Sequence, residues 1–559
     1  MQRKKKRKYV QLTDNDEINR LLNTVVSSVK DFTESQFEQI RRLTQIGAAL
    51  SAESNIERLL EMILEEAKRF TNADGGTLYI MSDDEKRLHF AIVETDSLNV
   101  RMGGLSGEIT WPPVELYNEN GDPNYANVSS YSALSGNVVN IADVYNIDEY
   151  NFEGTRQYDA ETGYRSQSML VIPMRNHEND IIGILQLINA RDRENGGTIP
   201  FSLFSQELTE SLASQAAIAL TKNRLIMDLQ NLFESFIKTI ATAIDEKSPY
   251  TGDHGRRVVE LTMMIAEEIN EMNHGPFESV FFNKDQMNEL RIAAWLHDVG
   301  KVAIPEYVMD KSTKLTTVHD RIDLLRTRIE VLKRDIENDV LRKELARRGG
   351  YNEESLINRC RHKINNLEDD YEFLASVNGG VECMTDDQVM RLTKIGRKSW
   401  MVNGKKQSLL TEDEMRNLVI RRGTLTDEER AIVNNHAAIT SRMLSQMPFP
   451  KKLKNIPCYA GSHHECLNGR GYPLGLKAED IPIQSRILAL ADVFEALTAS
   501  DRPYRRGNTL SQAVSILECM VRDDHLDADL FDLFINRKIH LDYAKKELSQ
   551  HQIDERDGR

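Results

Sequence analysis

The sequence predicts a multidomain protein with an α+β domain, a connecting helix and an all-α domain that is interrupted by an inserted helical hairpin. Three observations lead to this fold class. The chain has 559 residues, enough for about three to four domains of roughly 100–200 residues each. Strand-like runs and helical periodicity alternate in the first half, as in α+β domains. Beyond about residue 250 strand patterns are almost absent, so we expect the second half to be all-α.

Composition and charge restrict the function classes. The formal net charge of -16 argues against binding of a nucleic-acid polymer, which needs a basic footprint. The five cysteines form no CxxC pair, so we expect neither a disulfide scaffold nor a zinc ribbon. The basic start MQRKKKRKYV lacks the apolar segment of a signal peptide. No segment reaches the ~18 apolar residues of a membrane span. We therefore expect a cytoplasmic protein.

The first half divides into a basic, polar tail at 1–35 and an α+β domain at 36–222. Short apolar runs predict strands, and a helix that carries several leucines on one face precedes them. From Leu208 to about Lys247 the chain is helical with few breakers. We assign 223–247 to a connecting helix, which either forms a parallel coiled coil between two chains or packs on its own domain. The predicted strands lie at 76–81, 88–93, 168–174 and 181–189.

We assign 248–545 to the all-α domain and 546–559 to a polar tail. Within the domain, residues about 312–422 form an insertion. Apolar residues recur there at alternating spacings of three and four on both sides of a Gly-Gly pair, which predicts an antiparallel helical hairpin. Dense charge between the stripes is typical of exposed helices. A polar stretch, GRKSWMVNGKKQS at 396–408, follows.

Two motifs suggest a metal centre. HDVGK (297–301) ends an apolar helix, and HHECLNGRGYP (463–473) places two histidines before a glycine-rich turn. A buried His-Asp pair is costly unless a partner compensates it, and a metal is a common partner. A lone histidine is more often structural, but the joint occurrence favours two metals that share Asp298. Nitrogen and oxygen ligands without thiolate suit iron, manganese, cobalt or zinc. The candidates are His254, His297, Asp298, His436, His463, His464 and Asp492.

The order H…HDxGK…H…HHExxxGxGYP…D…RPYR resembles the HD-GYP family of bacterial, metal-dependent phosphodiesterases of cyclic dinucleotides. The resemblance covers about 240–312 and 423–540. It implies two divalent metals, iron or manganese, in an all-α HD-type fold. One metal would be held by His254, His297, Asp298 and Asp492, and the other by Asp298, His436, His463 and His464.

The resemblance also implies a reaction. Two metals about 3.5–4 Å apart stabilise both the attacking and the leaving oxygen of a phosphodiester. Asp298 would bridge them, and Lys301 would place its ammonium against the phosphate or leaving group. Arg502 and Arg505 offer planar forks for phosphate oxygens, or they form solvent salt bridges only. Tyr472 lies in the GYP loop, which in the family borders the site and is implicated in partner binding.

The favoured substrate is cyclic di-GMP, hydrolysed to linear pGpG and onward to GMP. A rival substrate is 3′,3′-cyclic GMP-AMP. A rival from another class is a non-catalytic module that binds a cyclic dinucleotide or a protein partner, at the GYP loop or at the insertion. A general nucleotide phosphohydrolase would share the HD pair but would not need the two adjacent histidines and the GYP turn.

Three features depart from the family pattern. Asn468 replaces the usual Asp before the GYP glycine, from which we expect altered loop hydrogen bonding and not a dead site. Tyr250 occupies the position of a carboxylate that holds a third metal in some members, so we expect two metals. The insertion separates His297 from His436. It should leave the site intact, because long loops cost little closure entropy, and it would act as a lid, a dimerisation arm or a partner surface.

The first half resembles a GAF domain of the cyclic-nucleotide-binding kind. The resemblance rests on NIADVYNIDEYNFEG (140–154), YDAETGYRSQSMLVIPM (158–174) and QLINARDRENGGTIPFSLFSQE (186–207), with Ala190 where that kind has Lys. It implies a small ligand at Thr162, Asn189, Phe204 and Glu207, or a structural role for these residues. Together the two resemblances imply a cytoplasmic signalling enzyme, expected to be a homodimer, in which the GAF domain regulates the catalytic domain.

Overall fold

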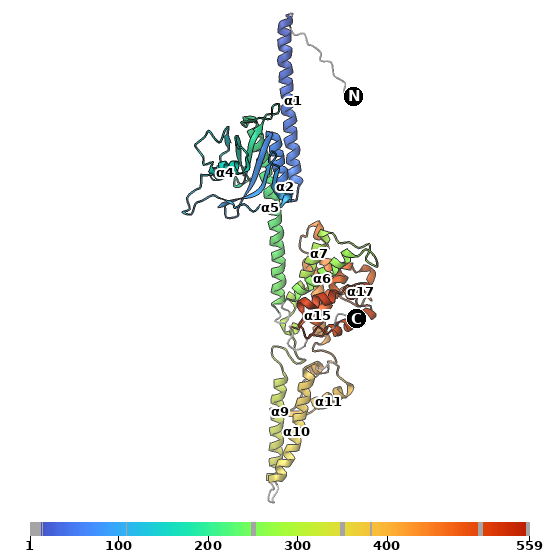
Figure 1. The fold of residues 1–559 in the computed structure, drawn as a ribbon. Helices are drawn as coiled ribbons and strands as arrows, with labels where there is room; N and C mark the ends of the chain where they lie inside the picture. Colours follow the sequence, from blue (N-terminus) through green and yellow to red (C-terminus); the bar gives the residue numbers. More distant parts are fainter. Residues whose placement is uncertain are drawn as a thin grey trace. The chain divides into compact units, whose positions relative to one another are not determined.

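The computed structural model describes residues 13 and 15–554, apart from 108, 248–252, 347–352, 381–382 and 501–506. Contacts between Cα atoms divide the chain after Asn231 into two compact units, and the long helix α5 (Leu203–Asp245) begins in the first unit and ends in the second (Figure 1). Among the described residues, no helix combines the length and the apolar character that a bilayer crossing requires.

The first unit is built on an antiparallel sheet with the strand order β3-β2-β1-β7-β6-β5, to which β4 and β8 add at β2 and β7. The four runs predicted as strands are confirmed as β1, β2, β6 and β7. The strands are β1 (Ala73–Met81), β2 (Arg87–Thr95), β3 (Val100–Gly103), β4 (Val114–Glu115), β5 (Val139–Ile141), β6 (Met169–Arg175), β7 (Ile181–Arg191) and β8 (Thr198–Ile199).

Alternation along the strands gives this sheet two buried faces. Leu78 and Leu185 point to a core shared with α1 (Asp16–Ala52), α2 (Ile56–Thr71) and α5. Their neighbours Tyr79 and Ile184 point to a second core under α3 (Val128–Ser135) and the following loops, because successive side chains of a strand face opposite sides. The remaining helices of this unit are η1 (Gly104–Ser106) and α4 (Glu153–Thr162).

The N-terminal boundary differs from the predicted tail at 1–35. Helix α1 begins at Asp16, after the capping side chain of Asn15, and continues without a break to Ala52. Its apolar residues Val25, Val29 and Phe37 are exposed. The apolar side chains in the first part of this helix lack a buried face, so this part resembles a polar tail in sequence.

The second unit is a helical bundle. Its main core joins α6, α7 and α15 to α18, and a smaller core joins the end of α5 to α7 and α14. The helices outside the insertion are α6 (His254–Glu271), α7 (Lys284–Leu296), η2 (Val299–Ala303), α8 (Glu306–Met309), α13 (Asp427–Leu444), η3 (Lys451–Leu453), α14 (Ile456–Gly461), η4 (Ala478–Asp480), α15 (Ile483–Thr498), α16 (Leu510–Arg522), α17 (Ala528–Asn536) and α18 (Ile539–Glu547).

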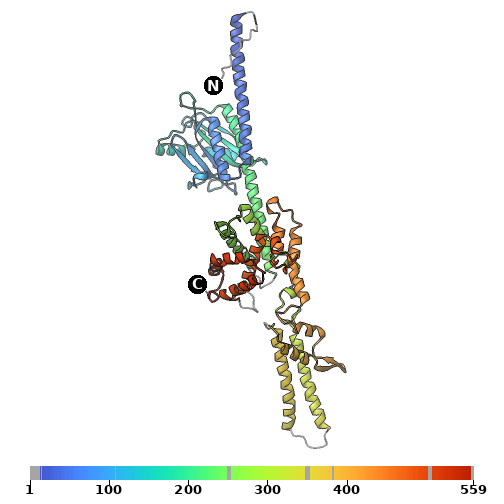
Figure 2. The same cartoon turned by 90° about the vertical axis from the view of Figure 1, so that its right-hand side faces the viewer.

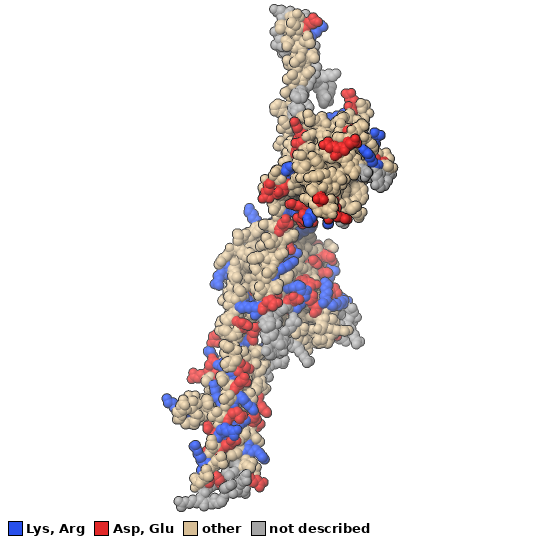
Figure 3. Space-filling view, turned by 90° about the vertical axis from the view of Figure 1, so that its left-hand side faces the viewer, with Lys and Arg blue, Asp and Glu red and all other residues tan. Residues whose placement is uncertain are grey.

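The insertion contains the predicted hairpin, formed by α9 (Ile322–Leu345) and α10 (Glu353–Asn378), which lie side by side in Figures 1 and 2. Acidic and basic side chains interleave over this region (Figure 3), and Arg326 pairs with Glu368 across the hairpin at 2.8 Å. The insertion also holds α11 (Asp386–Gly396) and α12 (Glu412–Leu418), and it has a hydrophobic core of its own.

Two further differences concern the second unit. The polar stretch at 396–408 forms a β-hairpin, β9 (Ser399–Val402) and β10 (Lys405–Ser408), so the second half is not all-α. Its Asn403-Gly404 turn has positive φ at both residues, as a two-residue hairpin turn requires. The predicted polar tail from 546 is also wrong in part. Gln552 is buried and donates to the carbonyl of Thr498 at 2.8 Å.

The ends of the insertion are joined by polar contacts. The ammonium of Lys311 binds the Glu429 carboxylate at 2.8 Å. The buried ammonium of Lys314 donates to the carbonyls of Leu418 and Ile420 at 3.2 and 2.7 Å. These contacts bring the two ends of the interrupted loop together, so the helices before and after the insertion can belong to one bundle.

Candidate metal centre and sensor pocket

The structure brings all seven predicted metal ligands into one cluster. His254 opens α6, His297 and Asp298 follow α7, and His436 lies on α13. The adjacent histidines follow α14, and Asp492 lies on α15. Six of the seven side chains are buried and His464 is partly buried. The groups whose donor atoms lie within 4.8 Å of one another are His254, His297 and Asp492; His297, Asp298 and His463; and His436, His463 and His464.

Backbone carbonyls orient three of the histidines in the same way. In each, Nδ1 lies within hydrogen-bond distance of the carbonyl three residues earlier, so Nδ1–H donates and Nε2 keeps its lone pair. The same local geometry at two helix ends and within α13 directs three Nε2 atoms toward the centre of the cluster. The pairs are His297 with Ala294 at 2.7 Å, His436 with Val433 at 2.7 Å and His463 with Ala460 at 2.6 Å.

The centre of the cluster contains buried polar atoms that have no hydrogen-bond partner among the residues that the structure describes. They are the Nε2 atoms of His254, His297, His436 and His463 and the Oδ1 atom of Asp298. His436 Nε2 lies 3.3 Å from Asp298 Oδ1, and His297 Nε2 lies 3.3 Å from Asp298 Oδ2. One unpaired buried group costs about 1–3 kcal/mol, so five together need a compensating partner. Divalent metal ions supply one for nitrogen and oxygen donors of this kind.

The pKa values at the cluster shift in different directions. Burial lowers the pKa of His254 and of His297, but the neighbouring carboxylates outweigh burial and raise both above the usual value, so a metal ion would displace protons there. Burial raises the pKa of the Asp298 carboxyl, but Lys301 and His297 outweigh burial and hold that pKa well below its usual range. Burial lowers the pKa of His464 to about 4. The carboxylate is therefore ionised and His464 is neutral at pH 7, which are the protonation states that ligands need. Lys301 Nζ lies 2.5 Å from Asp298 Oδ2.

Sequence reasoning missed Glu495. Nδ1–H of His254 donates to Glu495 Oε2 at 2.5 Å, and Nε–H of Arg257 donates to Oε1 at 2.7 Å. The Glu495 carboxylate therefore orients His254, as backbone carbonyls orient the three histidines described above. Glu495 follows Asp492 by three residues on α15, a spacing that places both on one helix face. That spacing was the available signal.

The glycine of HDVGK is explained by close packing. A Cβ at Gly300 would lie 2.0 Å from the carbonyl oxygen of His436. Thr440, which is buried on the same helix, accepts from Gly300 N at 2.9 Å and donates to His297 O at 3.0 Å. This contact fixes the turn that carries His297 and Asp298 against α13.

The GYP loop is held against the cluster. A Cβ at Gly471 would lie 2.2 Å from Cys466 N, and the Glu465 carboxylate accepts from the amides of Leu474 and Leu476. The Tyr472 ring lies 4.8 Å from the ring of His464. Asn468 Nδ2 donates to Asp523 O at 2.7 Å; an aspartate could not make this bond. Tyr250, Arg502 and Arg505 lie outside the described residues.

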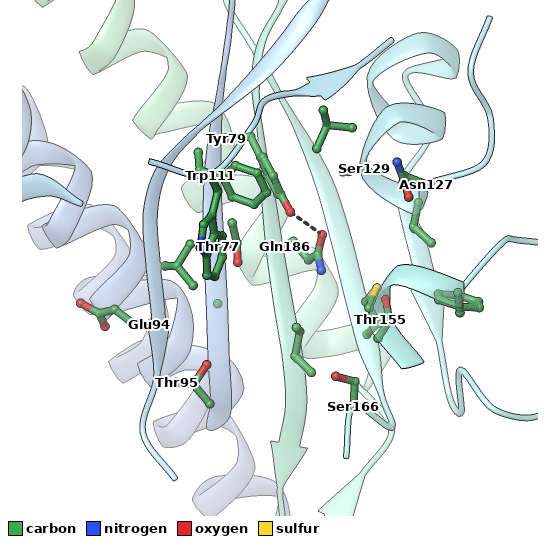
Figure 4. Close-up of a pocket in the computed structure, with 18 of the residues that line it drawn as sticks. Thr77, Tyr79, Glu94, Thr95, Trp111, Asn127, Ser129, Thr155, Ser166 and Gln186 are labelled. Atoms are coloured by element: carbon green, nitrogen blue, oxygen red, sulfur yellow. Dashed lines mark hydrogen bonds between the residues drawn. The ribbon is translucent and has the colours of Figure 1, made fainter. Parts of the chain in front are cut away.

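The first unit contains a second candidate site, a cavity of about 270 Å³ on the α3 side of the sheet (Figure 4). None of the four predicted ligand residues lines it. Thr162, Phe204 and Glu207 are exposed, at the end of α4 and the start of α5. Asn189 is buried, and its side chain accepts from Gln167 N and donates to Tyr164 Oη and Arg165 O. Its bonds link neighbouring backbone segments, which is a structural role.

Comparisons with known families agree with both sites. Residues 55–220 match the GAF domain family. Residues 251–362 and 412–530 match HD domain families. The chain is a GAF–HD domain protein. The first HD match contains His254, His297 and Asp298, and the second contains the other four cluster residues, so the two matched segments build one site. This architecture is consistent with the HD-GYP type.

The relatives overlap this chain in part. The chain is 40% identical over 114 residues to the "3'3'-cGAMP-specific phosphodiesterase 1" of Vibrio cholerae, covering 20% of this chain and 25% of the relative. It is 39% identical over 103 residues to the "Cyclic di-GMP phosphodiesterase" of Thermotoga maritima, covering 18% of this chain and 27% of that relative. The chain thus spans about a quarter of these relatives' length. The solved GAF domain of an Acinetobacter phosphoenolpyruvate-protein phosphotransferase aligns with 34% of this chain and 98% of its own, at 11% identity and TM-score 0.25.

Replacing Glu495→Gln should weaken metal binding about 10–100-fold, the usual effect of losing the carboxylate behind a ligating histidine. The amide cannot provide the charged acceptor that fixes His254. Calorimetric titration of metal-free protein with Mn²⁺ measures the affinity. Glu518→Gln, at an exposed glutamate on the neighbouring helix α16, is the control. Equal affinities in both variants would mean that Glu495 does not orient His254.

Proposed function

We propose that this chain hydrolyses a phosphodiester bond of cyclic di-GMP to give linear pGpG, and onward GMP, with two divalent metal ions, iron or manganese. The observation that carries the proposal is the set of unpartnered Nε2 and carboxylate oxygen atoms at the buried cluster. Histidine and aspartate donors in three overlapping groups, the middle one of which contains Asp298, fit two ions that share a carboxylate. The names of the relatives, which cover about a quarter of their length, support the same reaction class.

The ligand sets follow the geometry of the cluster. We assign Asp298 to both ions, because its Oδ1 lies 3.3 Å from His436 Nε2 and its Oδ2 lies 3.4 Å from His254 Nε2. When bound, such ions activate a water and stabilise charge that develops on phosphate oxygens. The first set is His254, His297, Asp298 and Asp492, and the second is Asp298, His436, His463 and His464.

The protein's own groups would orient the substrate. The Lys301 ammonium is partly exposed beside Asp298, so it can contact both the cluster and a phosphate that approaches from solvent. Tyr472 forms the wall next to His464, where its ring can contact a base or ribose. Arg502 and Arg505, outside the described residues, are further candidates for phosphate oxygens.

A second substrate is 3′,3′-cyclic GMP-AMP, and the observation that favours it is the 40% identity to a relative named for that activity. The two substrates differ in one base and share the scissile linkages. A non-catalytic module that binds cyclic dinucleotides or a protein partner at the GYP loop or the insertion is the alternative from another class.

We propose that the chain acts in the cytoplasm as a homodimer, with a small ligand in the GAF domain that regulates hydrolysis. An exposed apolar stripe on α5 supports the dimer. Leu225, Leu229, Leu232 and Phe236 are all exposed and follow spacings of four, three and four, the repeat of a coiled coil. Such a stripe can be buried by the same stripe of a second copy.

Protein purified anaerobically and loaded with iron or manganese should convert cyclic di-GMP to linear dinucleotide, measured by chromatography of the products. Asp298→Ala should lower turnover at least about 1,000-fold, because it removes the ligand common to both ions. The same assay with cyclic GMP-AMP ranks the two substrates.

Asp310 follows the HDVGK motif and is not a cluster residue. Asp310→Ala is therefore the matched control and should keep turnover. If metal-loaded protein with confirmed metal content left both substrates intact, the phosphodiesterase proposal would be wrong and the binding-module alternative would replace it.

A further inference from the structure

The GAF cavity carries an inference about the chemistry of its ligand, which rests on the proposed sensory role of this domain. Its lining combines an aromatic wall with polar side chains. The rings of Tyr79 and Phe90 are 4.8 Å apart, and Phe90 meets Trp111 edge-on at 5.4 Å. Figure 4 shows Trp111 and Tyr79 beside Thr77 and Gln186, with Asn127 and Ser129 across the cavity.

The polar side chains are placed where a ligand could use them. Thr77 and Gln186 are directly opposite each other on β1 and β7, on a sheet face that otherwise packs apolar residues. Within the described structure, Gln186 makes one side-chain contact, a long one at 3.4 Å in which its Oε1 accepts from Tyr79. Its amide nitrogen thus remains a donor. Asn127 caps α3 without a side-chain hydrogen bond. Both amides offer a donor and an acceptor to one ring edge.

The charge of the lining excludes a phosphate. No Lys, Arg or His is among the described residues that line the cavity. Its one carboxylate, Glu94, is already paired with Lys68 at 3.3 Å and Arg101 at 3.1 Å. The start of α3 attracts an anion weakly, and this attraction is smaller than the cost of burying an unpaired phosphate. A carbonyl oxygen of a neutral ligand can accept from the same helix start.

We propose that this cavity binds one uncharged planar heterocycle with amide-like edges, of the size and chemistry of a purine base. At about 270 Å³ the cavity lies just below the range of drug-sized ligand sites. The heterocycle lies against the Trp111 and Phe90 wall and hydrogen-bonds to Gln186, Thr77 and Asn127. A cyclic nucleotide, which the sequence resemblance implies, does not fit this lining.

The test measures binding to the full-length protein, without any assay of hydrolysis, so its failure is separate from failure of the phosphodiesterase proposal. Hypoxanthine, guanine and adenine are compared with cyclic AMP and cyclic GMP by calorimetric titration. We expect a base to bind at least about 10-fold more tightly than either cyclic nucleotide. Gln186→Leu should weaken that binding about 10-fold, and Glu207→Gln, outside the cavity, should not.

Tighter binding of a cyclic nucleotide, or no binding of any of the three bases, would overturn the assignment. A second variant, Thr77→Val, protects the test against misfolding of Gln186→Leu. It keeps the side-chain shape and removes one hydroxyl, so it should weaken base binding by a few-fold while the melting temperature stays within a few degrees of the parent. Unchanged affinity in both variants also contradicts the proposal.

A different observation concerns the C-terminal end of α5. Just beyond it, the Lys247 ammonium donates to three carbonyls, those of Lys301 at 3.1 Å, Val302 at 2.6 Å and Ile304 at 2.6 Å. These carbonyls belong to the segment that directly follows the His297-Asp298 pair. The Asp245 carboxylate accepts from Gly255 N at 3.2 Å, next to His254. One helix end therefore contacts two of the three segments that carry ligands of the first ion, the third being α15 with Asp492.

Apolar packing ties the same helix end to α7. Ile237 of α5 is buried with Ile292 and Leu296, one residue before His297. Glu234 of α5 binds Arg291 at 2.8 Å. We infer that Lys247 is a positioning residue through which α5, a helix that begins in the GAF unit, sets the geometry of the Asp298–Lys301 segment.

Lys247→Met should lower turnover about 10-fold or more, since small misplacements of reacting groups are costly, while metal content stays unchanged. Hydrogen exchange of the amides at 299–304 should accelerate, a readout that does not require hydrolysis. Lys247→Arg should restore part of the turnover and part of the exchange protection at 299–304. Lys238→Met, an exposed lysine on the same helix, is the control. Normal exchange at 299–304 in Lys247→Met, or equal effects in the control, would refute the inference.

Discussion

The arrangement of the second unit depends on one constraint, the burial of four imidazole nitrogens and a carboxylate oxygen without hydrogen-bond partners. Left alone, these atoms would oppose folding. The surrounding structure nevertheless directs them inward, through three backbone carbonyls and through Glu495 behind His254. A cluster that directs so many lone pairs to one point has the donor set that metal ions require, and bound ions would compensate these atoms.

The same constraint explains the residues that surround the ligands. Gly300 and Thr440 let the HDVGK turn pack against α13, and Glu465 holds the GYP loop beside His464. The insertion leaves this packing undisturbed because Lys311 and Lys314 close its ends and because it has its own core. Lys247, just beyond the end of α5, binds the segment that follows His297 and Asp298, and α5 itself begins in the GAF unit.

The cluster was predictable from the sequence because metal chemistry restricts residue types. His297-Asp298 and His463-His464 are rare pairs, and their motifs identify partners far apart in the chain. Glu495 was not found, because a glutamate on a helix has many ordinary roles. The β9–β10 hairpin was missed although Asn403-Gly404 is a strong turn signal, since the flanking strands are short and polar. The cavity residues come from five strands, two helices and loops, and no local pattern joins them.

The central claim is that two metal ions bind at the cluster and share Asp298. Crystals of anaerobically purified full-length protein, measured at the iron and manganese absorption edges, test it most directly. The account predicts two anomalous peaks, both within ligand distance of the Asp298 carboxylate, one beside His254 and the other beside His436. A single peak, or peaks that leave Asp298 without a metal contact, would contradict it.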